Sequence, residues 1–227
     1  MTERQSQDRS PLRGGPVRDE KPRGQGRRDV VALGLTGGMG AGKSTALAIF
    51  RELGAVTISA DELVHELYAR PSVSAEIGAR FGRRVLDEEG KVNRSLLAAS
   101  VRGRDRELRW LEELVHPLVA GEIERYIKDA PAESVLVCEV PLLFESGLDR
   151  LFDLVVTIEA DRDARRRRSI HDFDIDMFSE LEALQASSEE RVAGSDLSFY
   201  NDGDVEHLRR FVRRAFAQAL RLLEEPR

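Results

Sequence analysis

The sequence contains very little cysteine and no long hydrophobic run. Cys138 is the only cysteine in 227 residues, so the chain can form no internal disulfide and no zinc site built from several thiolates. This usage is typical of a reducing compartment and predicts a cytoplasmic protein. The longest apolar stretches, 30–35 and 135–144, are far shorter than the roughly 20 residues that cross a bilayer, which excludes a membrane-spanning helix.

Excess positive charge is also lacking. The chain has 35 Lys and Arg against 41 Asp and Glu, a net charge of −6, which argues against a dedicated nucleic-acid-binding protein. Apolar residues make up 41%, enough for a hydrophobic core. We therefore expect small-molecule substrates and neither a membrane nor a nucleic-acid partner. Nothing in this composition sets the oligomeric state.

Residues 1–28 differ from the remainder. They carry a net charge of +4 and few large apolar residues, so they cannot bury enough surface to offset the entropy of ordering them. We expect a disordered basic tail here, with the folded domain at 29–227. Its Arg-Gly segments can contact RNA, although short basic tails are usually only solvated.

From Asp29 onward, short apolar runs alternate with longer segments of helical period, which predicts a parallel sheet with helices on both faces. The expected strands are Val30–Thr36, Ala55–Ser59, Ser134–Val140, Asp153–Ile158 and Asp196–Tyr200. The expected helices are Lys43–Leu53, Ala60–Ala69, Ser74–Phe81, Arg94–Val101, Asp105–Lys128, Arg162–Arg168, Met177–Ala193 and Val205–Leu223. This is an α/β chain. A helical insertion at about 61–130 has the length and place of a subdomain for a second substrate.

A phosphate-binding loop follows the first expected strand. Residues Gly37–Ser44 fit G-x-x-x-x-G-K-[ST] at every fixed position. Its glycines let backbone N–H groups turn toward phosphate oxygens at the start of the next helix. Lys43 can reach the β- and γ-phosphates, and the Ser44 hydroxyl can hold Mg²⁺. Two alternatives fit these residues less well. One is an ordinary glycine-rich turn, and the other is a dinucleotide-binding loop, which would need glycine in place of Lys43.

Two carboxylates lie at or near the ends of other expected strands. Asp61 lies just beyond the second strand, where a carboxylate can orient a hydroxyl acceptor or take its proton. Asp61 can alternatively cap the following helix together with Ser59. Glu139 lies near the end of the third strand, where it can order the water shell of Mg²⁺, and burying it without such a partner would be costly.

Arginines follow the fourth expected strand, at Arg162 and 165–168, and are suited to a lid at about 161–186 that stabilises charge on a transferring phosphoryl group. At least half of them can equally form a solvated helix face. His116-Pro117 is expected to end or bend its helix, and His116 either lines the acceptor pocket or packs structurally. The remaining histidines have no metal-ligand spacing.

Five motifs in order resemble the dephospho-coenzyme A kinase family of P-loop kinases, over about residues 31–215. They are Leu33–Thr45, Ile58–Asp61, Gly90–Arg94 with Leu97, Leu111–Leu118 and Pro141–Glu145. The loop is shared with many kinases, whereas His116-Pro117-Leu118 followed by Pro141–Glu145 is more specific. Gln185, Arg191 and 201–203 resemble the family's lid-helix and final-loop positions.

The resemblance implies a three-layer P-loop fold with an acceptor-binding insertion and a lid, and ATP-dependent phosphorylation of the ribose 3′-hydroxyl of dephospho-coenzyme A. It implies that Asp61 and Lys43 are catalytic, that Asp61, His116 and Leu142 contact the acceptor and that Asn201 lies near the adenine. ATP and Mg²⁺ are the implied cofactors, with Ser44 at the metal. The implied nucleotide-binding residues are Gly38, Met39, Gly40, Ala41, Gly42, Lys43, Ser44, Thr45 and Asn201.

The chain departs from the family pattern at Ser59, His65 and His171-Asp172, where the family often has aspartate, arginine and an Arg-Asp pair. Other small-molecule kinases share the loop, sheet and lid, but the acceptor motifs argue against them. A GTP-dependent switch is a second alternative, since Asn201–Asp204 superficially resembles N-K-x-D, but its lysine is missing. A nucleotide-binding protein without turnover is a third, if the altered lid is disabling.

Overall fold

The computed structural model describes residues 29–169, 178–179 and 182–225. The expected disordered tail, His171-Asp172 and part of the expected lid lie outside these residues.

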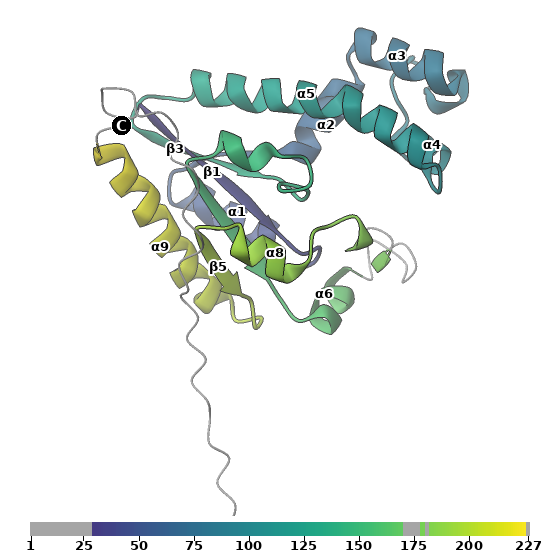
Figure 1. The fold of residues 1–227 in the computed structure, drawn as a ribbon. Coiled ribbons are helices and arrows are strands. Elements are labelled where there is room, and N and C mark those ends of the chain that lie inside the picture. Colours follow the sequence, from purple (N-terminus) through teal and green to yellow (C-terminus); the bar gives the residue numbers. More distant parts are fainter. Residues whose placement is uncertain (1–28, 170–177, 180–181, 226–227) are drawn as a thin grey trace, which may run out of the picture.

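A parallel sheet of five strands forms the centre of the molecule (Figure 1), and all five expected strands are confirmed to within one residue at each end. The strand order is β2-β3-β1-β4-β5, so β1 is central and pairs with both β3 and β4. The strands are β1 (Val30–Gly37), β2 (Val56–Ser59), β3 (Ser134–Glu139), β4 (Leu154–Glu159) and β5 (Leu197–Tyr200). Their carboxyl ends therefore lie along one edge, where open α/β sheets bind ligands.

Helices cover both faces of this sheet. They are α1 (Lys43–Glu52), α2 (Ala60–Tyr68), α3 (Pro71–Phe81), α4 (Arg94–Val101), α5 (Asp105–Asp129), α6 (Arg162–Ser169), α8 (Ser188–Ala193) and α9 (Val205–Glu224), with short 3-10 turns at Arg83–Val85 and Leu148–Leu151. Among the described residues, no helix is long and apolar enough to span a membrane.

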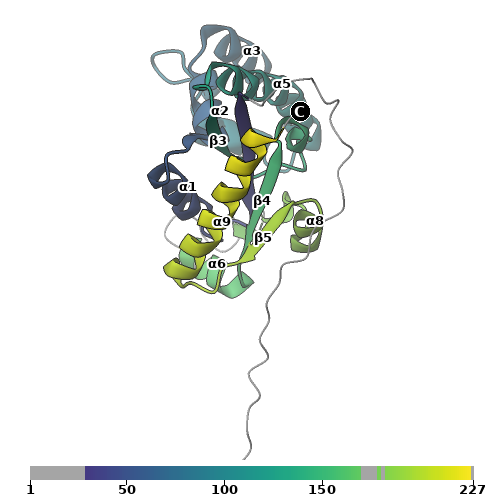
Figure 2. The same cartoon turned by 90° about the vertical axis from the view of Figure 1, so that its left-hand side faces the viewer.

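The alternation of β1 side chains separates the core into two layers. Val31, Leu33 and Leu35 pack in one cluster with residues of α1 and α9, while Ala32 packs in the other with residues of α2 and α5. Successive strand residues point to opposite faces, so a strand that is apolar throughout must be covered on both sides. Figure 2 shows α9 in front of the sheet, where it packs beside α1 and against β1, β3 and β5. The expected helix–sheet–helix arrangement is confirmed.

The expected helix Met177–Ala193 is wrong in being continuous, although the described residues 178–179, 182–183 and 188–193 are helical. The chain is not helical at residues 184–187, and α8 begins only at Ser188. The Ser187 hydroxyl accepts the Glu190 N–H at 3.2 Å, and the Glu190 carboxylate accepts the Ser187 N–H at 2.8 Å. This reciprocal capping box starts a new helix at this place.

Pro117 does not end its helix, contrary to one expected effect, because α5 continues through it to Asp129. Proline removes one backbone donor and disfavours a helical residue before it. However, Val115, Val119 and Ile123 form a buried stripe along this helix. Burial of that stripe offsets the local cost, since tertiary packing supplies most of the stability of a helix within a protein.

The packing of Gly34 makes a stability prediction. A Cβ atom at Gly34 would lie 2.8 Å from the Phe152 ring in the core, so we expect Gly34→Ala to destabilise the fold by about 1–3 kcal/mol. Gly121 lies inside α5, and outside the helix's own backbone no heavy atom of the described residues lies within 4 Å of a Cβ atom placed there. Gly121→Ala is therefore the matched control, and we expect it to raise the free energy of unfolding by about 0.5–1 kcal/mol. Urea unfolding measures both. Equal effects of the two variants would contradict the packing argument.

Candidate active site

The carboxyl ends of the strands bring the expected site residues together. The loop after β1, Asp61 after β2 and Glu139 at the end of β3 lie along one edge of the sheet. Glu159 at the end of β4 and Asn201 after β5 lie along the same edge. Parts of the chain that are far apart in sequence thus form one site.

The start of α1 is open to an anion. Gly42 is the N-cap, in the left-handed conformation at φ 107°, and a Cβ atom there would lie 2.6 Å from the Asn201 amide nitrogen. Glycine is therefore required at this position. Among the described residues, no side chain caps α1, and its first turn contains no acidic residue. The unpaired N–H groups and the positive end of the helix dipole fit phosphate oxygens.

Lys43 is buried beneath this loop, with 8% of its surface exposed. Its ammonium group donates hydrogen bonds to the Gly37 and Gly38 carbonyl oxygens, each at 3.1 Å. Burial lowers the pKa of Lys43, and the negative charges of Glu139 and Asp61 partly oppose that shift by raising the pKa. The two carboxylates predicted from sequence therefore act on the predicted phosphate-binding lysine.

The pKa of Lys43 makes a pH prediction. The folded protein binds this proton less tightly than the unfolded chain does, so Lys43 costs stability at neutral pH and costs less as pH rises toward 10.5. We expect the free energy of unfolding of wild type, relative to Lys43→Met, to increase between pH 7 and pH 10. Urea unfolding of both proteins across this range measures the difference. A constant or decreasing difference would contradict the lowered pKa.

Glu139 and Asp61 differ in their surroundings. Glu139 is half-buried; burial raises its pKa, the Lys43 charge lowers it, and the Asp61 charge raises it. Asp61 is exposed at the second residue of α2. Ser59 is the N-cap of this helix but its side chain makes no capping hydrogen bond. Asp61 thus offers an accessible carboxylate whose charge, like that of Glu139, acts on the buried Lys43.

Asn201 anchors the loop directly. Its side chain is buried, and its amide nitrogen donates to the Ala41 carbonyl oxygen at 2.7 Å. Its amide oxygen accepts the Gly203 N–H at 3.0 Å. Asn201 therefore lies at the phosphate end of the site. Its expected place near the adenine stays a prediction.

The structure distinguishes one lid arginine from the others. Arg165 is 7% exposed and lies against the loop, since a Cβ atom at Gly38 would be 2.9 Å from its side chain. Its Nη2 donates to Glu182 at 2.6 Å, whereas its buried Nη1 has no hydrogen-bond partner among the described residues. A buried donor without a partner is costly, which marks this nitrogen as available to a ligand.

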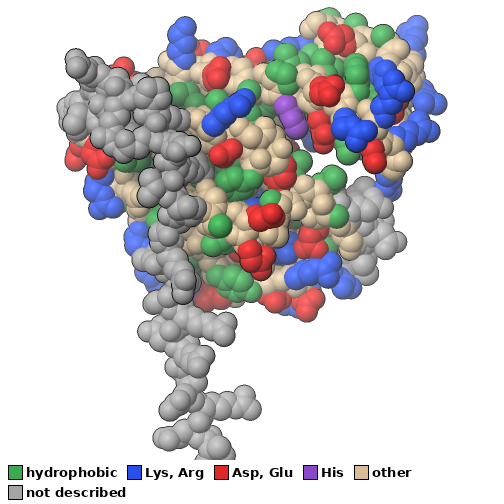
Figure 3. Space-filling model, in the orientation of Figure 1, with side chains coloured by type: hydrophobic (Ala, Val, Ile, Leu, Met, Phe, Trp, Pro, Cys, Tyr) green, Lys and Arg blue, Asp and Glu red, His purple; other side chains and the backbone are tan. Residues whose placement is uncertain are grey.

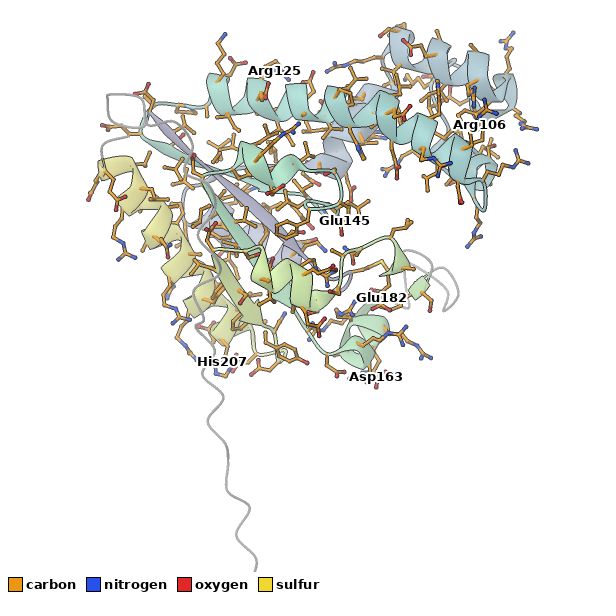
Figure 4. All side chains as sticks on the ribbon, in the orientation of Figure 1. Arg106, Arg125, Glu145, Asp163, Glu182 and His207 are labelled. Carbon is orange, nitrogen blue, oxygen red and sulfur yellow. The ribbon has the colours of Figure 1, made fainter. Side chains whose placement is uncertain are left out.

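The other arginines of α6 are exposed, although Arg168 also contacts the loop. Arg162 is 62% exposed and pairs with Glu182, which Figure 4 shows beside α6. Arg168 is exposed and donates to the Gly40 carbonyl oxygen at 3.3 Å, while Arg166 and Arg167 are exposed. The sequence could not rank these side chains, because their ranking depends on how α6 packs against the loop.

Three further residues support the site. Gln185 and Arg191, known from sequence only through the family pattern, contact the loop and Glu159 respectively. The sequence analysis did not single out Glu159. A carboxylate at the end of a buried strand, the signal that pointed to Glu139, could have identified it. His116 and Leu142 are half-buried, and among the described residues the His116 ring makes no hydrogen bond to the loop. Their acceptor contacts stay predictions.

The molecule is hollowed beside this edge of the sheet. Figure 3 shows the hollow on the right, between the helices α3 to α5 above and the α6 to α8 region below. On the insertion, a cavity of about 210 Å³ and one of about 260 Å³ are both lined by arginines. The first is lined by Arg80, Arg106, Arg109, Trp110 and Glu113, and the second by Arg84, Leu96, Ala99, Ser100 and Arg104.

Comparison with known proteins identifies the family. A family model for dephospho-CoA kinase matches residues 31–207. The chain is 33% identical to the dephospho-CoA kinase of Aquifex aeolicus, over 83% of this chain and 97% of that protein. It is 38% identical to that of Corynebacterium diphtheriae, over 80% of this chain and 93% of the relative. A crystal structure from Thermus thermophilus superposes with a TM-score of 0.71 at 28% identity, over 83% of this chain and 97% of the other. The chain with this phosphate-binding loop, parallel sheet and buried lysine therefore belongs to the dephospho-CoA kinase family of P-loop kinases.

Proposed function

We propose that this kinase transfers the γ-phosphoryl group of ATP to the ribose 3′-hydroxyl of dephospho-coenzyme A, giving coenzyme A and ADP. The observation that carries this proposal is the placement of Lys43 beneath the phosphate-binding loop and within the field of Asp61. Family membership supports the choice of both substrates. We infer a cytoplasmic location from the single cysteine, which suits a reducing compartment.

The nucleotide phosphates bind at the start of α1. Lys43 and backbone N–H groups within 38–44 hold the β- and γ-phosphates, which the open helix terminus favours. The Met39 N–H and the Ala41 N–H instead donate to the Gln185 side chain and the Gly38 carbonyl oxygen. Ser44 and Thr45 are exposed on the first turn of α1, and the Ser44 hydroxyl is a hard oxygen donor suited to Mg²⁺. The metal ion, when bound, neutralises charge on the phosphates. Arg165 lies against Gly38 of the loop, its buried Nη1 has no hydrogen-bond partner among the described residues, and it stabilises charge on the transferring group.

Asp61 acts on the acceptor. Its carboxylate accepts the hydrogen bond of the 3′-hydroxyl and takes the proton as the oxygen attacks the γ-phosphorus. The new O–P bond forms as the bond from the γ-phosphorus to the bridging oxygen breaks, so ADP leaves with those electrons. The exposed position of Asp61 beside the buried Lys43 supports this role.

The insertion at about 61–130 binds the remainder of the acceptor. Dephospho-coenzyme A carries an anionic diphosphate, and guanidinium groups bind such oxygens well. Arg106, visible on α5 in Figure 4, and Arg109 line one insertion cavity together with Arg80 and a single carboxylate, Glu113. Their charge supports an anionic acceptor over a neutral one. His116 and Leu142 contact the acceptor as the family resemblance implies.

Product formation tests the proposal. Purified protein is incubated with ATP and Mg²⁺ and with dephospho-coenzyme A, AMP, pantetheine phosphate or no acceptor, and ADP and coenzyme A are quantified. We expect ADP release above background only with dephospho-coenzyme A, with equimolar coenzyme A. Release with AMP alone would instead indicate a nucleoside monophosphate kinase.

Removing the metal ion tests its role separately. With EDTA in excess over Mg²⁺, we expect coenzyme A formation to fall at least about a hundredfold, because charge on the phosphates is no longer neutralised. Restoring Mg²⁺ should recover the rate, while Na⁺ at equal ionic strength should not. Turnover that persists in EDTA would contradict the assignment of Ser44 as a metal ligand.

A further inference from the structure

Gln185 connects the phosphate-binding loop to the turn after β3. Its side-chain nitrogen donates to the Gly37 carbonyl oxygen at 3.3 Å and to the Pro141 carbonyl oxygen at 3.0 Å. Its side-chain oxygen accepts the Met39 N–H at 3.2 Å. One amide group thus bonds two backbone positions of the loop and one position at the end of the neighbouring strand.

These contacts fix the direction of a loop N–H group. In a planar trans peptide the carbonyl oxygen and the following N–H point to opposite sides. A side chain that holds the Gly37 oxygen therefore sets the direction of the Gly38 N–H, and Asn201 does the same for the Gly42 N–H through the Ala41 oxygen. An anion site made of backbone donors depends on this orientation, because the donors cannot rotate independently.

The residue after Gln185 is held on both sides. The Ala186 N–H donates to the Glu145 carboxylate, and the Ala186 carbonyl oxygen accepts a hydrogen bond from Arg191 Nη1. Figure 4 shows Glu145 in the turn after β3, on the side that faces α8. Ser187, the next residue, is the N-cap of α8 and forms the capping box with Glu190. The backbone position of Gln185 is therefore determined by its neighbours.

Arg191 is itself held by a buried ion pair. Its Nε and Nη2 donate to the two Glu159 carboxylate oxygens at 2.6 and 3.0 Å, and the exposed fractions are 4% for Arg191 and 3% for Glu159. A bidentate pair allows one relative orientation of its members. Glu159 ends β4, so the ion pair fixes Arg191 of α8 relative to the sheet. Arg191 in turn holds the Ala186 carbonyl oxygen.

We propose that Gln185 is a positioning residue that orients the phosphate-binding loop for nucleotide, and that the Glu159–Arg191 ion pair acts through Gln185 by holding the Ala186 carbonyl. The proposal rests on the proposed function, because it assumes that the loop binds nucleotide phosphates. It extends that function to residues that lie outside the phosphate-binding loop.

The first test replaces the side-chain nitrogen of Gln185. Gln185→Glu keeps the shape and the acceptor for the Met39 N–H but removes the donor to the Gly37 and Pro141 oxygens. We expect the Kd for ADP, from titration calorimetry with the full chain, and the KM for ATP each to rise about tenfold, with the KM for the acceptor unchanged. Glu189→Gln is the matched control: Glu189 is exposed on α8, and this variant should leave all three constants unchanged.

The second test asks whether Arg191 acts through Gln185. Arg191→Lys keeps the positive charge but loses the bidentate pair and the hydrogen bond to Ala186, so the KM for ATP should rise in the same direction as with Gln185→Glu. The Gln185→Glu/Arg191→Lys double variant should have about the effect of the larger single change, because both changes interrupt one connection. If Arg191→Lys does not fold, the Gln185→Glu result alone decides the first half of the proposal.

Three results would overturn the inference. Unchanged ADP binding in Gln185→Glu would show that the loop does not need this residue, and tighter binding would show that Gln185 competes with nucleotide. Multiplying effects in the double variant would show that Arg191 acts independently. If wild type itself fails to bind ADP, the proposed function fails as well. If wild type and Gln185→Glu bind ADP equally well, only the positioning role of Gln185 is removed.

Discussion

Replacing Lys43 with alanine is expected to lower kcat/KM for ATP about a thousandfold. Lys43 is the buried cation of the loop, and its ammonium group now satisfies the Gly37 and Gly38 carbonyl oxygens. Its removal leaves developing charge on the β- and γ-phosphates without its main cationic partner. Steady-state kinetics at saturating dephospho-coenzyme A, combined with ADP titration, measures both turnover and nucleotide affinity.

The control for this variant lies on the surface. Lys128→Ala removes an exposed lysine in the last turn of α5, outside the five family motifs, and it should leave the kinetics unchanged. Circular dichroism and urea unfolding check that Lys43→Ala is folded. Turnover within threefold of wild type in folded Lys43→Ala protein would mean that the loop does not bind the transferring phosphate.

Replacing Asp61 with asparagine is expected to lower kcat by about 10²- to 10⁴-fold, the usual contribution of a positioned general base. Asparagine keeps the size and can still hold the acceptor hydroxyl, but it cannot take the proton. Because Asp61 is exposed and caps no helix, we expect little loss of stability. Nucleotide affinity should stay close to that of wild type, since Lys43 and the loop are intact. Rapid-quench measurement of a single turnover reports the chemical step directly.

The matched control for Asp61 is Glu66→Gln on the same helix. Glu66 is an exposed carboxylate on α2, so this variant repeats the loss of one negative charge without touching the proposed base. Equal loss of kcat in both variants would assign the effect to net charge. A single-turnover rate in Asp61→Asn equal to that of wild type would remove Asp61 from the role of base.

Local patterns in the sequence predicted the sheet well and two helical features poorly. The five strands are short, mostly apolar runs. Such runs are typical of strands in a parallel sheet covered on both faces, and they can be recognised without knowing the strand order. The break before α8 was missed, although Ser187 and Glu190 have capping-box spacing, because the surrounding period favoured one continuous helix. Pro117 was given too much weight, because burial along α5 outweighs its local cost.

The sequence by itself determined the phosphate-binding loop, the five strands and the two carboxylates near strand ends, since each depends on residues within one short segment. Only the tertiary structure decided which arginines contact the loop and what holds the loop in place. Gln185 contacts Met39 across 146 positions of the chain, and Asn201 contacts Ala41 across 160. Such contacts depend on the strand order that puts β1 between β3 and β4, and no local pattern of residue types encodes that order.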